Sequence, residues 1–443
     1  MFKNLTKEKR ESYIFLAIML TSMVVRLFFI YYTSVYDMQH DAGTPTENYG
    51  HLGYIAYFMN NWKLPDFDVR EAFQFWHPPI HHIISAAFLT LVWKIFPGLH
   101  GNYEALQLLP FVYTTLCIWI LWKTLKLWDF EEKALFLPML LIAFNPTFIA
   151  FSGSINNDAL CTTLTFLALY FTLAWYKNPT HRLVIASALS IGLAMSVKGS
   201  AAIAAFPMAL LFLLKLIKEK KKVFGQLFVF GLLSLPLGLW WYIRNYILFG
   251  VPVNYIYYMS TEATGYIGHV SLYQRLHGCN PHYFSFANMY LQFEGNYTDV
   301  NPIVGLLKTA VYGQWRFNYN PYIKVIAYPL LFIWIALTGL SLTGIPFFLK
   351  KNKERLAESV SILVLFVVQF ASYYQFCLDF PFVWTMDFRY AILLLLCHCL
   401  FLAELIRQKK GTRTEHLIKY LCIAFTAITI ICFVLLSFTT FQV

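Results

Sequence analysis

The segment IHHIISAAFLTLVWKIFP, residues 80–97, decides how this chain is organised. It is apolar enough to cross a bilayer, yet it carries two histidines and Lys94, and Pro78 and Pro79 precede it. Each crossing reverses the side of the membrane on which the next loop lies. The status of this one segment therefore sets the side of every later loop. The distribution of basic residues can decide the question, because cytoplasmic loops carry an excess of Lys and Arg.

The chain is apolar throughout and basic overall. Of its 443 residues, 58% are hydrophobic and only 13% are charged, whereas soluble domains carry roughly 25% charged residues. Apolar runs long enough to span a bilayer recur from Tyr13 to Phe441. The net charge is +11, and the basic residues cluster in short gaps between these runs. Such clusters orient membrane proteins, so nucleic acid is not a predicted partner.

Basic residues favour a topology in which 80–97 does not cross. In that case about two thirds of the chain's 34 Lys and Arg residues fall on one side, in 1–13, 123–133, 177–182, 215–222, 350–355 and 407–413. If 80–97 crossed, most of them would face outside. We therefore predict that 80–97 is a juxtamembrane or re-entrant helix, and that the N-terminus is cytoplasmic.

The predicted fold is an all-α polytopic membrane protein that forms one integral membrane domain over residues 1–443. About eleven transmembrane helices are expected, at 12–33, 105–122, 134–151, 159–176, 182–197, 200–217, 224–247, 325–348, 356–377, 388–406 and 417–440. Two long segments, 34–104 and 249–323, are expected outside, and the first contains juxtamembrane helices. The first apolar run lacks a small-residue cleavage site and is predicted to be a signal anchor.

Isolated polar residues lie at the outer ends of the predicted spans, where charged groups are expensive and usually functional. They are Asp41, Glu47, His51, His77, Asp158, Lys198, Arg244 and Arg389. This arrangement fits transfer from a phosphate-bearing lipid. A carboxylate can serve as general base on an acceptor hydroxyl, and cations can stabilise the departing phosphate.

Each of these residues also has a purely structural interpretation that the sequence leaves open. Asp41 can cap the N-terminus of a helix that starts near Glu47, and Asp158 can be the N-cap residue of the span predicted at 159–176. Lys198 and Arg244 can extend their charged ends to the interface. Arg389 can pair with the neighbouring Asp387, and His77 can form hydrogen bonds at the interface.

Five motifs follow one another between residue 12 and about residue 400. They are HDAGTPTENYGHLGYIAYFMNNWKLPD followed by FWHPPIHHII (40–66 and 75–84), NNDAL (156–160), VKGSA (197–201), YIRNYILFG (242–250) and FRYAILLLL (388–396). In this order they resemble the GT-C glycosyltransferases, and most closely the branch of protein O-mannosyltransferases and aminoarabinose transferases. The resemblance implies the GT-C fold and an inverting transferase that uses a polyprenyl-phosphate sugar.

The resemblance also implies roles for individual residues. Asp41 is implied as catalytic base, and Asp158 as a second acid that orients acceptor or donor. His77 is implied to lie near the lipid phosphate, with Glu47 and His51 also among the substrate-binding candidates. The phosphate-side cations are implied to be Lys198, Arg244 and Arg389.

One departure from the family pattern concerns metals. Ala42 follows Asp41 where the mannosyltransferases carry a second acid, so an adjacent acid pair that bridges a metal is missing. The eight cysteines show no metal-ligand spacing. No cofactor is predicted with certainty, and no metal-binding residue is assigned, although the resemblance is compatible with a divalent metal.

We therefore predict a multi-pass membrane glycosyltransferase of the hexosyl or pentosyl class. Its predicted location is the bacterial inner membrane, with an external active site among membrane lipids. The acceptor hydroxyl belongs to a protein, a glycan or a lipid. A transporter or flippase is the alternative and would need polar residues through the membrane midplane. A non-catalytic glycolipid-binding member of the family is a third hypothesis.

Overall fold

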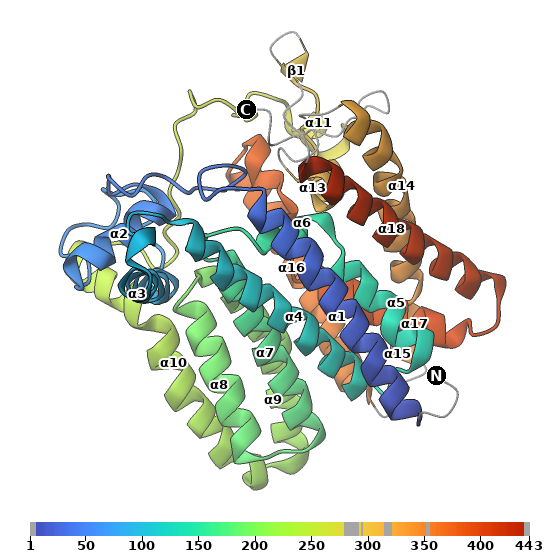
Figure 1. Ribbon diagram of the computed structural model, residues 1–443. Coiled ribbons are helices and arrows are strands. Elements are labelled where there is room, and N and C mark those ends of the chain that lie inside the picture. Colours follow the sequence, from blue (N-terminus) through green and yellow to red (C-terminus); the bar gives the residue numbers. More distant parts are fainter. Residues whose placement is uncertain (1–5, 279–291, 294–295, 314–320, 351–354, 438–443) are drawn as a thin grey trace. The chain divides into compact units, whose positions relative to one another are not determined.

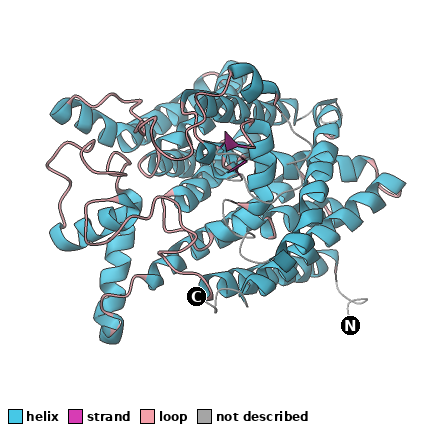
Figure 2. Ribbon diagram, turned by 90° about the horizontal axis from the view of Figure 1, so that it is seen from above, coloured by secondary structure: helices cyan, strands magenta, loops and turns pink. Residues whose placement is uncertain are grey.

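The computed structural model describes residues 6–278, 292–293, 296–313, 321–350 and 355–437. These residues are mainly helical, as Figures 1 and 2 show. The described strands are β1 (Gln292–Phe293) and β2 (Asn296–Tyr297), which pair antiparallel. The predicted all-α membrane architecture is confirmed.

The chain divides into two compact units. Unit 1 contains residues 1–32, 121–150 and 259–443, and unit 2 contains residues 33–120 and 151–258. Unit 2 includes seven of the eight candidate site residues, and Arg389 lies in unit 1. Each unit is described separately below.

Unit 2 is built on long helices that carry shorter ones at one end (Figure 1). The α-helices are α2 (Gly50–Asn61), α3 (Ile80–Ile95), the first part of α4 (Leu108–Leu127), α7 (Asp158–Lys177), α8 (His181–Met195), α9 (Ala205–Glu219) and α10 (Lys221–Phe249). Short 3₁₀ helices are η2 (Pro97–Leu99), η3 (Glu104–Gln107) and η4 (Gly199–Ala204). Helix α8 packs against α7 and α10, and α2 packs against α3.

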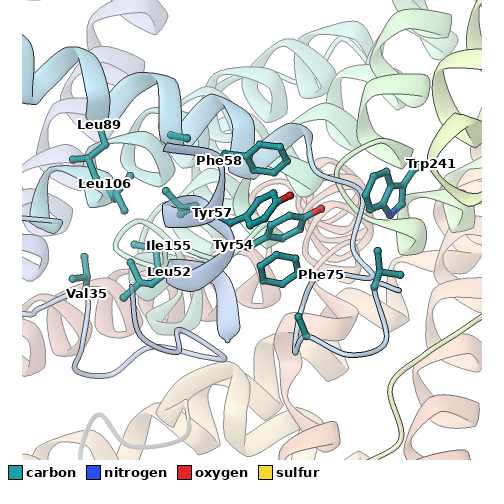
Figure 3. Packing of buried hydrophobic residues seen from close by; sticks show 14 of the residues in the cluster. Val35, Leu52, Tyr54, Tyr57, Phe58, Phe75, Leu89, Leu106, Ile155 and Trp241 are labelled. Carbon is teal, nitrogen blue, oxygen red and sulfur yellow. The ribbon is translucent and has the colours of Figure 1, made fainter. Parts of the chain in front are cut away.

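A buried aromatic core fixes α2 within unit 2. The Tyr54 ring of α2 stacks on Phe75 with centroids 4.1 Å apart and on Phe58 with centroids 5.2 Å apart (Figure 3). Trp241 of α10 belongs to the same cluster, and its indole N–H donates to the Trp76 carbonyl at 3.0 Å. This core holds the segment 34–104 against helix α10.

Unit 1 contains the remaining helices. They are α1 (Lys7–Tyr31), α5 (Glu132–Ala143), most of α6 (Pro146–Phe151), α11 (Leu272–His277), α13 (Pro302–Tyr312), α14 (Pro321–Thr343), α15 (Ile345–Lys350), α16 (Leu356–Asp379), η6 (Val383–Met386), η7 (Phe388–Ala391), α17 (Leu394–Gln408) and α18 (Arg413–Ser437). The buried helix α17 packs against α5 and α14, and α1 packs against α5 and α18.

Eight of the described helical segments are long and apolar enough to cross a membrane. They are Lys7–Tyr31, Glu104–Leu127, Asp158–Lys177, Gly199–Glu219, Lys221–Phe249, Val325–Lys350, Leu356–Asp379 and Arg413–Leu436. Helix α3 has 16 residues and is about 24 Å long at 1.5 Å per residue. That length is short of a hydrocarbon core of about 30 Å, which agrees with the interpretation of 80–97 as juxtamembrane.

Three of the eleven predicted spans are shorter or interrupted. The span 134–151 breaks between Ala143 and Pro146, because proline cannot continue the hydrogen-bond ladder of α5. The spans predicted at 182–197 and 388–406 contain α8 and α17, which have 15 residues each. The count of eleven, the sidedness and the two outer segments therefore remain predictions.

Gln39 ties the start of unit 2 to a segment far away in the sequence. Its side-chain amide donates to the Gly153 carbonyl at 2.9 Å, and its side-chain oxygen accepts from the Ile155 amide at 3.1 Å. A single side chain thus satisfies two backbone groups that no helix pairs. The turn before α7 is held to residue 39 in this way.

Glycines shape the turn that leads into α2. Gly43 and Gly50 have φ values of +67° and +75°, and Thr44 and Tyr49 form an isolated antiparallel bridge. A Cβ at Gly43 would overlap the Tyr49 carbonyl, and one at Gly53 would overlap the Glu47 carbonyl. The two strands of this turn approach so closely that only glycine fits.

We expect Gly43→Ala to destabilise the protein by more than about 1 kcal/mol, because it adds a left-handed-region penalty to a backbone overlap. Gly98→Ala is the matched control, since no atom lies within 4 Å of a Cβ at Gly98 and its φ is not positive. Thermal unfolding of both purified variants checks this. Equal midpoints would contradict the tight turn.

Candidate active site

Backbone carbonyls of the Asp41 segment cap helix α2. The amides of His51 and Leu52 donate to the carbonyls of Asp41 and Ala42 at 3.0 and 2.7 Å. The Gly50 amide donates to the Phe73 carbonyl at 3.1 Å. Helix α2 begins at Gly50 instead of near Glu47, and the side chain of its N-cap residue, Tyr49, makes no capping hydrogen bond. A capping role for the Asp41 side chain stays a prediction.

Asp41 itself has φ +57°, a conformation that aspartate and asparagine tolerate better than other non-glycine residues. Its side chain is half-buried. Because the Asp41 carbonyl binds the His51 amide, the position of this aspartate is coupled directly to the first turn of α2.

Three histidine rings lie close together and nearly parallel. The rings of His51 and His82 meet edge to edge, with centroids 5.2 Å apart and His51 Nδ1 2.9 Å from His82 Nε2. The half-buried His77 ring is nearly parallel to the His51 ring, with centroids 6.1 Å apart. The His-Pro-Pro turn thus places the His77 ring near His51, in the first turn of α2.

Burial keeps these imidazoles neutral. It lowers the pKa of His51 and His82 well below the ordinary value, and the neighbouring histidines lower it further. Burial also lowers the pKa of His81 to about 4. His81 Nε2 lies 2.8 Å from the Ile155 carbonyl. The side chains of His51, His81 and His82 are therefore polar but uncharged at neutral pH.

An ion pair joins the NNDAL and VKGSA motifs. Lys198 Nζ contacts Asp158 Oδ1, and the side chains are only 15% and 9% exposed. The Asn157 side chain donates to the Val197 carbonyl at 3.0 Å, which holds the two turns together. Asn157, rather than Asp158, is the N-cap residue of α7. Lys198 is thus held inside the unit instead of reaching outward.

Lys198 is also close enough to His51 to act on it electrostatically. Its positive charge contributes to lowering the pKa of His51, after burial and the other histidines. The negative charge of Asp158 acts to raise the pKa of His81, against the larger effect of burial. His51 is thus linked to the Asp41 segment through its backbone amide and to Lys198 through the charge of that lysine.

Arg244 makes contacts at another part of unit 2. Its guanidinium donates to the Pro65 carbonyl and to Asn245 Oδ1, the latter at 2.7 Å. It also lies over the rings of Trp241 and Phe249, with centroid distances of 5.1 and 5.6 Å. These contacts fasten the chain after α2 to the end of α10. The predicted phosphate contact of Arg244 is an additional role that these contacts do not test.

The two remaining candidates are Glu47 and Arg389. Glu47 is exposed, and its carbonyl accepts from the Tyr49 amide at 2.8 Å. Arg389, in unit 1, is buried in η7, and its guanidinium donates to the Tyr390 hydroxyl at 2.6 Å. The Asp387 side chain accepts from the Arg389 amide at 2.8 Å.

Sequence reasoning did not assign His81 and His82 to the site. The signal was available, since two adjacent histidines in an apolar segment must each find a buried partner. Trp241 was missed as well, because its contact with the Trp76 carbonyl joins residues 165 positions apart.

The side chains that could bind a metal ion are those of His, Cys, Asp and Glu. Among residues 6–278 and the later described ranges, no group of three or more His, Cys, Asp or Glu side chains is arranged to hold a metal ion. No step of the reaction below is therefore assigned to a metal.

Residues 77–241 match a family model described as dolichyl-phosphate-mannose-protein mannosyltransferase. The match supports a membrane glycosyltransferase of the GT-C type. It confirms the resemblance predicted from the motifs and covers His77, Asp158 and Lys198. Arg244 lies just beyond the matched range, and Asp41, Glu47, His51 and Arg389 also lie outside it. No curated protein matches the chain.

The buried histidines predict how stability depends on pH. Their pKa values are lower in the folded than in the unfolded state, where histidine has a pKa near 6.5. The unfolded state therefore binds protons first, and stability is lost as the pH falls from about 6.5 through 4. His81→Gln, whose amide can donate to the Ile155 carbonyl but does not titrate, should reduce this loss in thermal unfolding. The exposed His100→Gln is the control, and an unchanged pH profile for His81→Gln would contradict the prediction.

Proposed function

We propose that this chain transfers a sugar from a polyprenyl-phosphate donor to an acceptor hydroxyl at the outer face of its membrane. The observation that supports this most strongly is the arrangement around His51. The Asp41 carbonyl binds the His51 amide, and Lys198, which is paired with Asp158, acts electrostatically on the His51 ring. Residues 41 and 198, from motifs more than 150 residues apart, are thus both linked to His51 in unit 2.

The proposed reaction is a single displacement. The Asp41 carboxylate accepts the proton of the acceptor hydroxyl, and the hydroxyl oxygen attacks the anomeric carbon. The bond from this carbon to the phosphate oxygen breaks, and its electron pair stays on the leaving lipid phosphate. The transition state has oxocarbenium character, as glycosyl transfer generally does.

Lys198 is proposed to stabilise the phosphate as its charge develops. Arg244 and Arg389 are the further phosphate-side cations of the proposal. Asp158 is proposed to orient the donor through Lys198. A lysine ammonium has three donors, so it can hold Asp158 and a phosphate oxygen at once. The ion pair then positions the cation before the donor arrives.

The histidines and Glu47 complete the proposed site. His77, half-buried and nearly parallel to His51, is proposed to donate to a phosphate oxygen. The exposed Glu47 is proposed to contact the acceptor. The proposed outer-face location is supported by the distribution of Lys and Arg along the chain, and the membrane is proposed to be a bacterial inner membrane.

Asp41→Asn should abolish transfer while leaving the fold intact. Asparagine tolerates the left-handed conformation of residue 41, and its carbonyl can still bind the His51 amide. Loss of a general base costs about 10²–10⁴-fold in rate. The measurement is release of labelled sugar from a polyprenyl-phosphate donor by the purified chain. Asp37→Asn, an exposed aspartate in the same segment, is the control. Full activity of Asp41→Asn would remove Asp41 as base.

Lys198→Gln should slow donor turnover by about 10²-fold or more, the usual cost of removing one charge-stabilising donor. Lys94→Gln, an exposed lysine of α3, is the control and should retain activity. Asp158→Asn should lower activity less than Lys198→Gln, because it leaves the cation in place. Equal turnover by Lys198→Gln and the parent chain would eliminate the phosphate role of Lys198.

A further inference from the structure

Four aromatic side chains form a continuous platform in unit 2, made of Tyr49, Phe73, Trp76 and Tyr257. The Tyr49 and Phe73 rings stack with centroids 4.9 Å apart, and the Trp76 and Tyr257 rings stack at 5.3 Å. Phe73 meets Trp76 and Tyr257 edge to face at 5.4 and 5.5 Å. Residues from the turn before α2, from the 70–77 loop and from the segment after α10 thus form one surface.

The platform borders the proposed catalytic group. The isolated bridge between Thr44 and Tyr49 aligns the Asp41 segment with the start of the platform. Burial raises the pKa of the Tyr49 hydroxyl, and the nearby Tyr257 and Asp41 raise it further. At the other end of the platform, the His77 ring lies 5.2 Å from the Trp76 ring. A carboxylate and an imidazole therefore lie beside the aromatic faces.

This surface is accessible. Tyr49 is 51% exposed and Tyr257 is 37% exposed, while Phe73 and Trp76 are half-buried. The tyrosines each combine an apolar ring with a hydroxyl at its edge. Rings stacked on one another in this way keep the platform rigid, so a ligand that packs on it need not order flexible side chains.

The chemistry of the platform favours a sugar ring over a lipid chain. A pyranose has an apolar C–H face that packs on an aromatic ring, and a rim of hydroxyls that needs polar partners. Tyrosine hydroxyls, Asp41 and His77 supply such partners around the rings. A lipid chain requires an aliphatic surface without polar edges, and a peptide hydroxyl would reach Asp41 without needing several stacked rings.

We infer that this platform is the acceptor subsite and that the acceptor is a glycan, whose terminal pyranose packs on Tyr49 and Tyr257 beside Asp41. This inference rests on the proposed transferase function, because it assigns the acceptor of that reaction. It narrows the acceptor from protein, glycan or lipid to a sugar-bearing molecule.

The test measures sugar binding separately from catalysis. Methyl glucopyranoside, mannopyranoside and galactopyranoside are the probes, and saturation-transfer NMR on the full chain in a detergent without sugar groups is the readout. At least one probe should bind the parent chain. The Tyr49→Ala/Tyr257→Ala double variant should weaken that binding at least fivefold, whereas Tyr49→Phe/Tyr257→Phe, which keeps the rings, should retain most of it. Tyr36→Ala, an exposed tyrosine of the same unit, is the control.

Equal binding by the double alanine variant, or binding of a Ser/Thr peptide in place of every sugar probe, would overturn the inference. Turnover of a polyprenyl-phosphate sugar by water is followed in parallel, since it needs the donor site alone. If the double alanine variant keeps this turnover but loses sugar binding, the acceptor subsite is supported and the variant is folded. If the parent binds sugar through the platform but never turns over donor, the proposed function fails while the sugar site stands.

Discussion

Unsatisfied backbone groups at helix ends are the constraint on which the site depends. The first three amides of α2 need acceptors, and they find them in the carbonyls of Asp41, Ala42 and Phe73. An unpaired buried amide costs roughly as much as a lost hydrogen bond with its desolvation, about 1–3 kcal/mol. Because three amides share this requirement, the Asp41 segment and the 70–77 loop cannot move away from α2 independently. The geometry of the proposed base is thus a consequence of helix capping.

The Lys198–Asp158 pair adds a second constraint of a different kind. Removing two charges from water is expensive, and a buried pair is weak evidence for stability on its own. Here the pair lies where two turns meet, and Asn157 binds the Val197 carbonyl beside it. We interpret the cost as the means of holding an ammonium in a fixed place, which is what stabilisation of a developing phosphate charge requires.

The fold was largely predictable from the sequence, and the details of the site were not. Apolar runs predicted the helical membrane architecture. Whether 80–97 crosses the membrane stays a prediction, because α3 has 16 residues while α8 and α17, which lie in predicted spans, have 15 each. The start of α2 was misplaced, because carbonyl caps leave no side-chain signature. Arg244 shows the same difficulty. The sequence motif identifies this residue, but it does not indicate that the Arg244 guanidinium donates a hydrogen bond to the Pro65 carbonyl. The stack of Tyr257 on Trp76 joins loops about 180 residues apart, and no local pattern records such a contact.

The bridge made by Gln39 has a consequence for biogenesis. Its partners Gly153 and Ile155 follow it by 114 and 116 residues. At a synthesis rate of about 5–20 residues per second, roughly 6–23 s separate their emergence from the ribosome. During that interval the segment that begins at residue 33 has left the ribosome without the groups that hold it. Assembly of the catalytic region must therefore wait until the helices around residue 155 have been inserted, which makes the nascent chain dependent on its insertion machinery.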